Sequence, residues 1–476
     1  MASIVVIGAG LAGSATAMLL ADDGHEVIVL ERDASPAPST PEAAWTAWNR
    51  RGVGQFHQAY AVQPRVTRLI EAELPEVNAG LRELGASALP WFCQLEAHFP
   101  EREALMARED RVALTARRPV MELAFAQAMA AKKKVDVRRG IAVVGLLTGR
   151  DDPPGVPGVR GVRLEGGEEI EADLVVDATG RSSRIVARLS EIGARAPAES
   201  HSNNAAIYYT RHVRFRADRR PVYKGGPMFQ NGHGIGLFCF PGDNDTWALA
   251  VWGLLDDPLL GGLRGAERFD AVVSRFPDRE QWLAEGEPVS DVMPCASAAD
   301  MTRRFVVDGA PVVTGLVAVG DAHAFTEPRL GRGTLYALFG ATALRDTLRD
   351  HLDAEPQALA RAWDERFTSA VGPHLAAANA AGRGFAAAAR AAWEAPSPAV
   401  DPADRAQVLN RAFEQAAEED LTVATWLLEL AGNEILPSEL LRQPGVVERV
   451  LEIGDHEPRR PRPGPTRAEL ADLLAT

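Results

Sequence analysis

The sequence predicts an α/β protein with a parallel sheet, a second sheet that is antiparallel, and a helical C-terminal region. Three observations lead to this fold class. Strand and helix patterns alternate in the first part of the chain. Between 206 and 252, apolar and polar residues alternate with the period of two that is typical of antiparallel strands. Beyond 351 the chain is mostly rich in Ala and Leu, which favours helix.

The first element is a strand, a glycine-rich turn, a helix and a second strand. Residues 3–7 are a short, largely apolar run, and the motif G-x-G-x-x-G at 8–13 follows directly. A small-residue helix at 14–21 comes next, and then a strand at 27–30 that ends on Glu31. A glycine motif in this context predicts a dinucleotide site.

Each residue of this motif has a physical role. Gly8 makes the tight turn, Gly10 lets backbone N–H groups approach a pyrophosphate, and Gly13 lets the helix pack close to the sheet. The helix N-terminus then faces the phosphates with its partial positive charge. Glu31 can accept hydrogen bonds from the adenosine ribose and would repel a 2′-phosphate. The remaining contacts expected here are Leu11, Ala12 and Arg32.

The bulk properties exclude some classes of function. The net charge of −14 and a pI near 5.3 argue against a nucleic-acid partner and against binding to an anionic membrane surface. The three cysteines lie far apart in no metal-ligand spacing, which favours reduced thiols and no metal site. With no leader pattern and no long apolar run, we expect a cytoplasmic protein without a membrane span.

Two later predicted strands are also followed by turns of small residues. A β-meander after 135 leads to a buried strand that ends at Asp177, Ala178, Thr179 and Gly180. A strand at 311–319 leads to a longer segment that precedes another helix. The residues of interest in that segment are Gly320, Asp321, Pro328, Gly331, Gly333 and Thr334. A further helix is expected to begin at Arg118, with Pro119 suited to its first turn.

Three signals follow one another along the chain: the glycine motif with Glu31, the strand that ends at 177–180, and the segment at 320–333. With these signals in this order, the chain resembles the FAD-dependent monooxygenases built on the glutathione-reductase type of Rossmann fold. Within that family, the chain looks most like bacterial tailoring oxygenases and epoxidases of secondary metabolism. The resemblance covers roughly residues 1–350, and its most specific part is the G-D-x6-P-x2-G-x-G element at 320–333. The loop at 51–55 is also similar, although Gly54 stands where the family usually has a proline.

The resemblance implies FAD as the cofactor and suggests roles for several residues. Asp321 would accept hydrogen bonds from the ribityl hydroxyls, and Arg118 would reach the pyrophosphate or the ribityl chain. Gly331 and Gly333, at a helix start, would present N–H donors to the N1–C2=O edge of the flavin, which stabilises the reduced form. The other expected contacts are Gln55, Asp177, Thr179, Gly180, Gly320, Pro328 and Thr334.

The expected domains follow from the same order of elements. An FAD-binding domain takes 1–75, 111–195 and 303–350, and a substrate domain takes 76–110 and 196–302. A helical region takes 351–476.

The implied activity is hydroxylation or epoxidation of a small, largely apolar substrate through a flavin C4a-hydroperoxide, with O2 as co-substrate. Electrons would come from NADH or NADPH bound directly, or from a separate flavin reductase. The substrate cavity would lie between the flavin and the second sheet. No residue is assigned a certain catalytic role; the weak candidates are His57, Tyr208, His233, Trp252 and His323. Core or sheet packing is the competing interpretation for the first four, and placement on a helix surface is the competing interpretation for His323.

Other functions remain open from the sequence. An FAD-dependent dehydrogenase or reductase would use the same cofactor site without O2, and a non-catalytic dinucleotide-binding protein is a further alternative. A flavin halogenase is disfavoured, because no lysine precedes Lys132 and no W-x-W-x-I-P segment occurs. The substrate and the choice between monomer and homodimer are not determined by the sequence.

Overall fold

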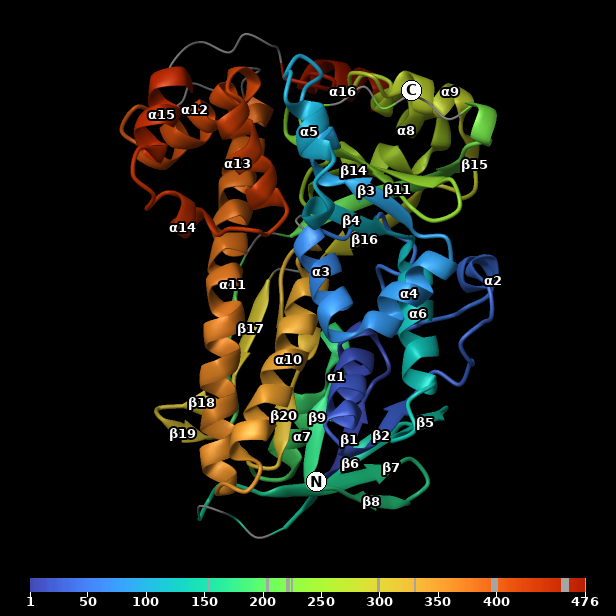
Figure 1. Cartoon of the computed structure of the whole chain (residues 1–476), viewed down its shortest axis with the longest axis vertical. Helices are drawn as coiled ribbons and strands as arrows, with labels where there is room; N and C mark the ends of the chain where they lie inside the picture. The colour runs from blue at the N-terminus through green and yellow to red at the C-terminus, as the bar shows by residue number, and fades with distance from the viewer. Residues whose placement is uncertain are drawn as a thin grey trace.

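The computed structural model describes the chain except for residues 150, 152–153, 203–204, 220–222, 224–225, 298–299, 329–330, 395–400, 455–461 and 476. A parallel sheet lies in the lower half of Figure 1 and an antiparallel sheet in the upper half. One long helix, α11 (Pro356–Glu394), runs along the side of both. The predicted α/β fold class with two sheets and a helical C-terminal region is therefore confirmed.

The parallel sheet has the strand order β20-β9-β1-β2-β5, and its described pairings are all parallel. The strands are β1 (Ser3–Ile7), β2 (Glu26–Glu31), β5 (Val135–Arg139), β9 (Leu174–Asp177) and β20 (Leu316–Ala318). Because parallel strands run in one direction, their carboxyl ends share one edge. The glycine turn, Glu31 and the two later turns of small residues therefore meet at that edge.

Helices cover one face of this sheet and a meander covers the other. The helices are α1 (Leu11–Asp22), α3 (Pro64–Glu73), α6 (Arg118–Ala130) and α10 (Gly333–His351), which share one apolar core with β1 and α11. The helix predicted to start at Arg118 does start there, with Pro119 in its first turn. The meander strands β6 (Val143–Thr148), β7 (Val159–Leu164) and β8 (Glu169–Glu171) pack against the opposite face, together with α7 (Ile185–Glu191).

The second sheet is antiparallel throughout its described pairings. Its strands are β11 (Ala206–Arg214), β12 (Phe229–Asn231), β13 (Ile235–Pro241), β14 (Thr246–Leu254), β15 (Glu287–Pro288) and β16 (Met293–Ser297). The turn between β13 and β14 contains Asn244 and Asp245 with φ of 49° and 61°, which confirms the predicted hairpin. One face carries Tyr209, Leu249 and Val251 and packs under α8 (Ala266–Val273) and α16 (Arg467–Ala475). The other face, with Tyr208 and Trp252 as cross-strand partners, points toward the parallel sheet.

The remaining elements are shorter than these or lie outside the two main sheets. They are α2 (Pro41–Thr46), α4 (Pro75–Glu83), α5 (Arg102–Met106), α9 (Glu280–Glu285), β3 (Ser87–Pro90), β4 (Val112–Thr115), β10 (Ala198–His201), β17 (Met301–Arg304), β18 (Val306–Val307), β19 (Ala310–Pro311) and β21 (Ala324–Phe325). Val77 and Leu81 of α4, in the range 76–110 that we expect in the substrate domain, lie in the core beside the parallel sheet. The domain division stays a prediction.

The C-terminal helices do not form one separate layer. The helices α12 (Arg405–Glu419), α13 (Leu421–Ala431), α14 (Pro437–Leu440) and α15 (Val446–Gly454) share a small core of their own, seen at the upper left of Figure 1. Ala424 and Leu428 of α13 pack instead in the core of the second sheet, as does Leu470 of α16. Within the described ranges, no helix is both long and apolar enough to cross a bilayer.

Candidate functional site

The glycine turn after β1 is shaped by two close backbone contacts. A Cβ on Gly13 would lie 1.9 Å from the carbonyl oxygen of Gly8, and a Cβ on Gly8 would lie 2.6 Å from that of Ala178. Gly8 also has a φ of 104°, which side chains rarely adopt. Gly10 differs, because a Cβ there would meet no heavy atom of the described chain within 4 Å. No side chain caps α1, so the turn offers backbone N–H groups beside open space, which fits a pyrophosphate.

Glu31 supports this turn from the end of β2. Its buried carboxylate accepts hydrogen bonds from the backbone N–H of Ala9 at 3.0 Å and of Asp33 at 2.9 Å. Arg50, which we had not predicted, donates to Glu31 at 3.1 Å and to the carbonyl of Ala9 at 3.2 Å. Arg50 also lies 3.3 Å from the carboxylate of Glu122 on α6. The only sequence signal for Arg50 is its position just before the loop at 51–55. Arg32 is exposed, with its guanidinium over Gly52.

The turn after β9 is organised by Asp177. This buried carboxylate accepts from the backbone N–H of Thr179 at 3.0 Å, from its hydroxyl at 2.6 Å and from Ser183 at 2.5 Å. Asp177 therefore shapes the turn from inside the protein. Gly180 has a φ of 75° and open space around its Cα, and Ala178 abuts the first glycine turn.

The late segment packs directly on α1. A Cβ on Gly320 would lie 2.6 Å from that of Ala12, and Gly320 has a φ of 58°. Asp321 follows it, half-buried, and no donor among the described residues contacts its carboxylate. Burial raises the pKa of Asp321, while the charges of Arg118 and Arg181 lower it. A carboxylate held beside two arginines remains available to accept hydrogen bonds from a ligand.

Arg118, the first residue of α6, contacts the loop before α3 and through it the late segment. It donates to Glu122 at 2.9 Å, and its guanidinium lies 5.1 Å from the centre of the Tyr60 ring. The hydroxyl of Tyr60 contacts that of Thr334 in the first turn of α10. No side-chain cap precedes α10, and Gly333 at its start has no heavy atom of the described chain within 4 Å of a Cβ position. This second uncapped helix N-terminus fits a group that gains negative charge.

The remaining residues predicted to contact FAD differ in their burial. Gly331 has a φ of 61°, and a Cβ there would lie 2.4 Å from the side-chain amide of Gln63. Pro328 is exposed, Leu11 is buried and Gln55 is half-buried. Residues 329–330 lie outside the described ranges.

The structure separates the five weak catalytic candidates. Tyr208 and Trp252 lie in an aromatic cluster with Phe229, Phe238 and Phe385, and the buried Tyr208 hydroxyl has no partner among the described residues. His57 lies in the loop against this face, with Nε2 at 3.0 Å from the carbonyl of Trp45. His233 lies in the turn between β12 and β13, which packs against Pro463 and Trp393, away from the glycine turns.

His323 is a core residue. Its Nδ1 lies 3.0 Å from the carbonyl of Ala318, and its ring stacks on Phe367 of α11 with centroids 3.6 Å apart. Burial lowers the pKa of His323 to about 4. The placement on a helix surface that we weigh against a catalytic role for His323 is therefore wrong, because the side chain is buried.

This lowered pKa predicts a pH-dependent stability. The unfolded chain binds a proton near pH 6.5 and the folded chain only near pH 4. The contribution of His323 is therefore complete above pH 6.5 and falls by up to ~1.4 kcal/mol per pH unit as the pH drops toward 4. The variant His323→Phe keeps a stacked ring without the titration, so its unfolding free energy should fall less steeply. Urea titrations between pH 7 and 4.5 measure both slopes, and equal slopes would contradict the assignment.

A second buried histidine, His212, lies on the face of β11 that points toward the loop at 45–58. Burial, followed by the charge of Arg117, lowers the pKa of His212 to about 3. Gln58 fastens this loop to the second sheet, because it accepts from the Thr210 hydroxyl at 2.7 Å and donates to the carbonyl of Met293 at 3.2 Å. Neither His212 nor Gln58 carried a sequence signal.

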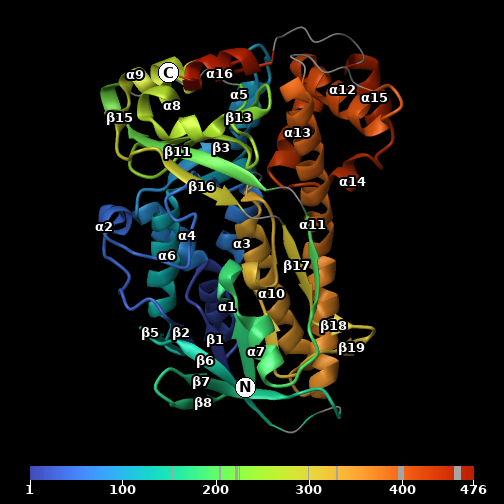
Figure 2. The same cartoon turned by 180° about the vertical axis from the view of Figure 1, so that it is seen from behind.

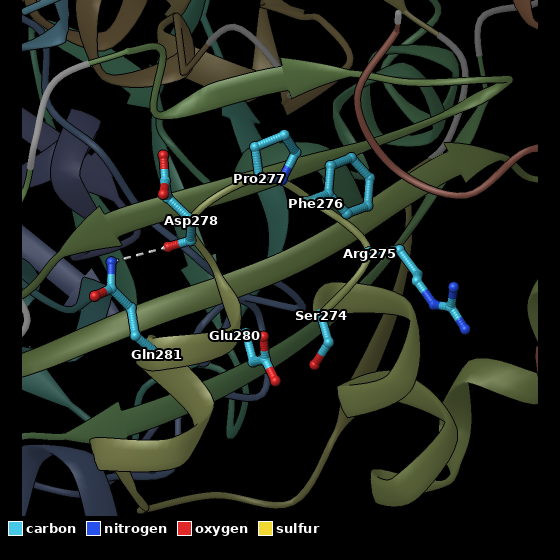
Figure 3. A pocket seen from close by; sticks show the side chains of 7 residues that line it. All are labelled: Ser274, Arg275, Phe276, Pro277, Asp278, Glu280 and Gln281. Carbon is cyan, nitrogen blue, oxygen red and sulfur yellow. Dashed lines mark hydrogen bonds between the residues drawn. The ribbon is translucent and has the colours of Figure 1, made fainter.

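Two cavities in the described part of the chain differ in their distance from the glycine turns. One of about 540 Å³ lies between this loop and β16, lined by residues that include Trp45, Trp48, Arg50, His57 and Pro294. The other, of about 360 Å³, is lined by residues 274–278 after α8 and by Glu280 and Gln281 at the start of α9 (Figure 3). This second cavity lies on the outer side of the second sheet, far from the glycine turns (Figure 1).

Comparison with known proteins bears on this arrangement. Residues 3–253 match the model of the family described as FAD dependent oxidoreductase. Protein Rv3254 of Mycobacterium tuberculosis (strain ATCC 25618 / H37Rv) is 29% identical over 377 residues, 72% of each chain. Pseudomonas aeruginosa PqsL, solved with 2-aminobenzoylacetate, has a TM-score of 0.59 at 18% identity over 82% of this chain and 98% of PqsL. The flavin-dependent brominase Bmp2 has a TM-score of 0.55 at 14% identity over 95% and 98%. These structural likenesses show a common fold.

Proposed function

The chain belongs to the FAD-dependent oxidoreductase family, and we propose that it is a monooxygenase that hydroxylates or epoxidises a small, largely apolar organic substrate. One observation carries this proposal. Two uncapped helix N-termini, the acidic end of β2 and the turn at Asp321 converge at one edge of the parallel sheet. The aromatic face of the second sheet points toward that edge.

The residues at this edge would hold FAD in an extended form. The pyrophosphate would lie at Gly10 and the start of α1, and Glu31 would accept from the adenosine ribose. Asp321 would accept from the ribityl hydroxyls. The flavin would face the start of α10 at Gly333 and Thr334. The further proposed contacts are Gly8, Leu11, Ala12, Gly13, Arg32, Gln55, Arg118, Asp177, Thr179, Gly180, Gly320, Pro328 and Gly331; Arg50 is added from the structure.

Bound FAD would supply redox chemistry, including reaction with O2. The chain's own contribution would be to orient the substrate and exclude water. The cluster around Tyr208, Phe238 and Trp252 is apolar, and the unpartnered Tyr208 hydroxyl offers one polar group to orient a substrate. The uncapped N-terminus of α10 would stabilise negative charge on the reduced cofactor. No side chain is assigned an acid or base role.

Three alternatives differ in measurable ways. A reductase would oxidise NADH or NADPH, and a dehydrogenase would oxidise its organic substrate, in both cases without incorporating oxygen from O2 into the product. A non-catalytic protein would bind FAD without turnover. A halogenase would need bromide or chloride, and the absence of lysine before Lys132 disfavours it.

The decisive experiment uses the purified protein reconstituted with FAD. Oxidation of NADH and NADPH and consumption of O2 are measured with aromatic test substrates, with and without an added flavin reductase, and with and without bromide. A product that gains one oxygen atom from O2 supports the proposal. A dehydrogenated product would indicate a dehydrogenase instead, and a brominated product would indicate a halogenase. The reductase arm also determines whether the nicotinamide binds directly.

The carboxylate of Asp321 gives a specific prediction for cofactor binding. Hydrogen bonds to charged groups contribute about 1.5–3 kcal/mol, so Asp321→Ala should weaken FAD binding by roughly ten- to a hundredfold. Flavin fluorescence quenching measures this dissociation constant. The variant Asp321→Asn keeps an acceptor and should lose less. Unchanged affinity in both variants would show that Asp321 does not face the cofactor.

A further inference from the structure

Arg332 lies between two glycines in the segment that leads into α10, the segment proposed to face the flavin. Its guanidinium is buried, and its Nε donates to the side-chain oxygen of Asn433 at 2.8 Å. Asn433 lies in the turn after α13, within the C-terminal helices. A residue far along the chain thus fixes the side chain that precedes the first turn of α10.

Asn433 makes a second contact with the core of the FAD-binding region. Its backbone carbonyl accepts a hydrogen bond from Nη1 of Arg65 on α3 at 2.8 Å. Asn433 is 2% exposed and has a φ of 58°, a left-handed conformation that asparagine tolerates better than most residues. One residue therefore bridges an arginine of α3 and an arginine at the start of α10.

Independent contacts hold this turn in place. Arg68 of α3 donates to both carboxylate oxygens of Glu434, one of them at 3.0 Å, and Arg111 donates to Glu429 at 3.4 Å. The indole N–H of Trp91 donates to the carbonyl of Leu428 at 2.7 Å. The turn is therefore anchored even without the contact between Asn433 and Arg332.

We propose that Asn433 is a positioning residue, which holds Arg332 and through it the backbone of Gly331 and Gly333 in the conformation that binds FAD. This rests on the proposed function, and it gives the C-terminal helices a role in cofactor binding. The N–H groups at the start of α10 stabilise negative charge on the flavin, so a displaced segment weakens binding of reduced FAD more than of oxidised FAD.

The test compares Asn433→Gly, Asn433→Asp and Glu429→Gln with the wild-type chain. Glycine keeps the left-handed backbone and its carbonyl, and removes only the side chain. Aspartate keeps an acceptor for Arg332. Glu429→Gln weakens the anchor at Arg111 and leaves Arg332 untouched. The measurements are the FAD dissociation constant, the flavin midpoint potential and the thermal midpoint of the protein without added FAD.

For Asn433→Gly we expect about tenfold weaker FAD binding and a midpoint potential lowered by about 30 mV, the equivalent of a further tenfold loss for reduced FAD in a two-electron couple. Asn433→Asp should keep most of the FAD affinity and of the midpoint potential, and Glu429→Gln should match wild type in both quantities. If Asn433→Gly keeps the wild-type FAD affinity and midpoint potential, the inference is overturned and the proposed function stands. The same holds if Glu429→Gln loses as much affinity and potential as Asn433→Gly. A wild-type chain that binds no FAD would overturn the proposed function and this inference together.

Discussion

Replacing Gly13 with alanine is expected to lower the free energy of unfolding by about 3 kcal/mol or more and to prevent the protein from retaining FAD. The added Cβ would lie 1.9 Å from the carbonyl oxygen of Gly8 and 3.2 Å from the side chain of Ala178. Backbone atoms cannot yield as a flexible side chain can, so α1 must move away from β1. Urea titration and the flavin absorbance of the purified protein measure the two losses.

Gly10 provides the matched control for this prediction. A Cβ at Gly10 meets no heavy atom of the described chain within 4 Å. The variant Gly10→Ala should therefore unfold within about 1 kcal/mol of wild type, the scale of a changed N-cap. If Gly13→Ala and Gly10→Ala unfold at the same urea concentration, the close approach of α1 to the sheet is wrong.

Replacing Asp243 with alanine should destabilise the protein by about 3–5 kcal/mol, because the buried Arg117 loses its buried counter-charge and keeps only the exposed carboxylate of Glu42 at 3.6 Å. Asp243 lies in the turn between β13 and β14 and is fully buried, as is Arg117 before α6. It accepts from the backbone N–H of Arg117 at 2.9 Å, from Nε at 3.0 Å and from Nη2 at 2.8 Å. Burial would raise the pKa of Asp243, but the hydrogen bonds and charge of Arg117 outweigh it and hold the pKa below its ordinary value.

Two further variants separate this pair from ordinary ion pairs. Glu169→Ala breaks an exposed contact with Arg163 on the meander and should change stability by less than about 1 kcal/mol. The double variant Arg117→Met with Asp243→Leu removes both charges and should recover much of the loss. Equal effects of Asp243→Ala and Glu169→Ala on the urea midpoint would show that the pair does not hold the hairpin to α6.

The parts of the fold that the sequence predicted are those set by local patterns. The strand, glycine turn and helix at 3–21 each have their own periodicity and turn residues, as does the hairpin around Asn244. The start of α6 followed from Pro119. For helix α4, the apolar positions Val77 and Leu81 do not reveal from the sequence which sheet they cover.

The parts of the candidate site that the sequence missed depend on distant segments. Arg50 gains its surroundings from Glu31 and Glu122, which lie on different elements. His323 lies within the motif at 320–333, yet its ring is buried against Phe367 of α11. A local sequence pattern does not predict which residues of a long helix contact a distant turn, so these contacts are seen only in the folded structure.

The central claim is that FAD lies across the carboxyl edge of the parallel sheet, with its pyrophosphate at Gly10. Titration of wild type and Gly10→Val with FAD, followed by flavin fluorescence, tests it most directly. We predict saturable binding by wild type, and binding at least tenfold weaker in Gly10→Val, whose stability without FAD should stay within about 1 kcal/mol of wild type. A wild-type protein that stays colourless with FAD, or a Gly10→Val variant that binds equally well, would contradict the claim.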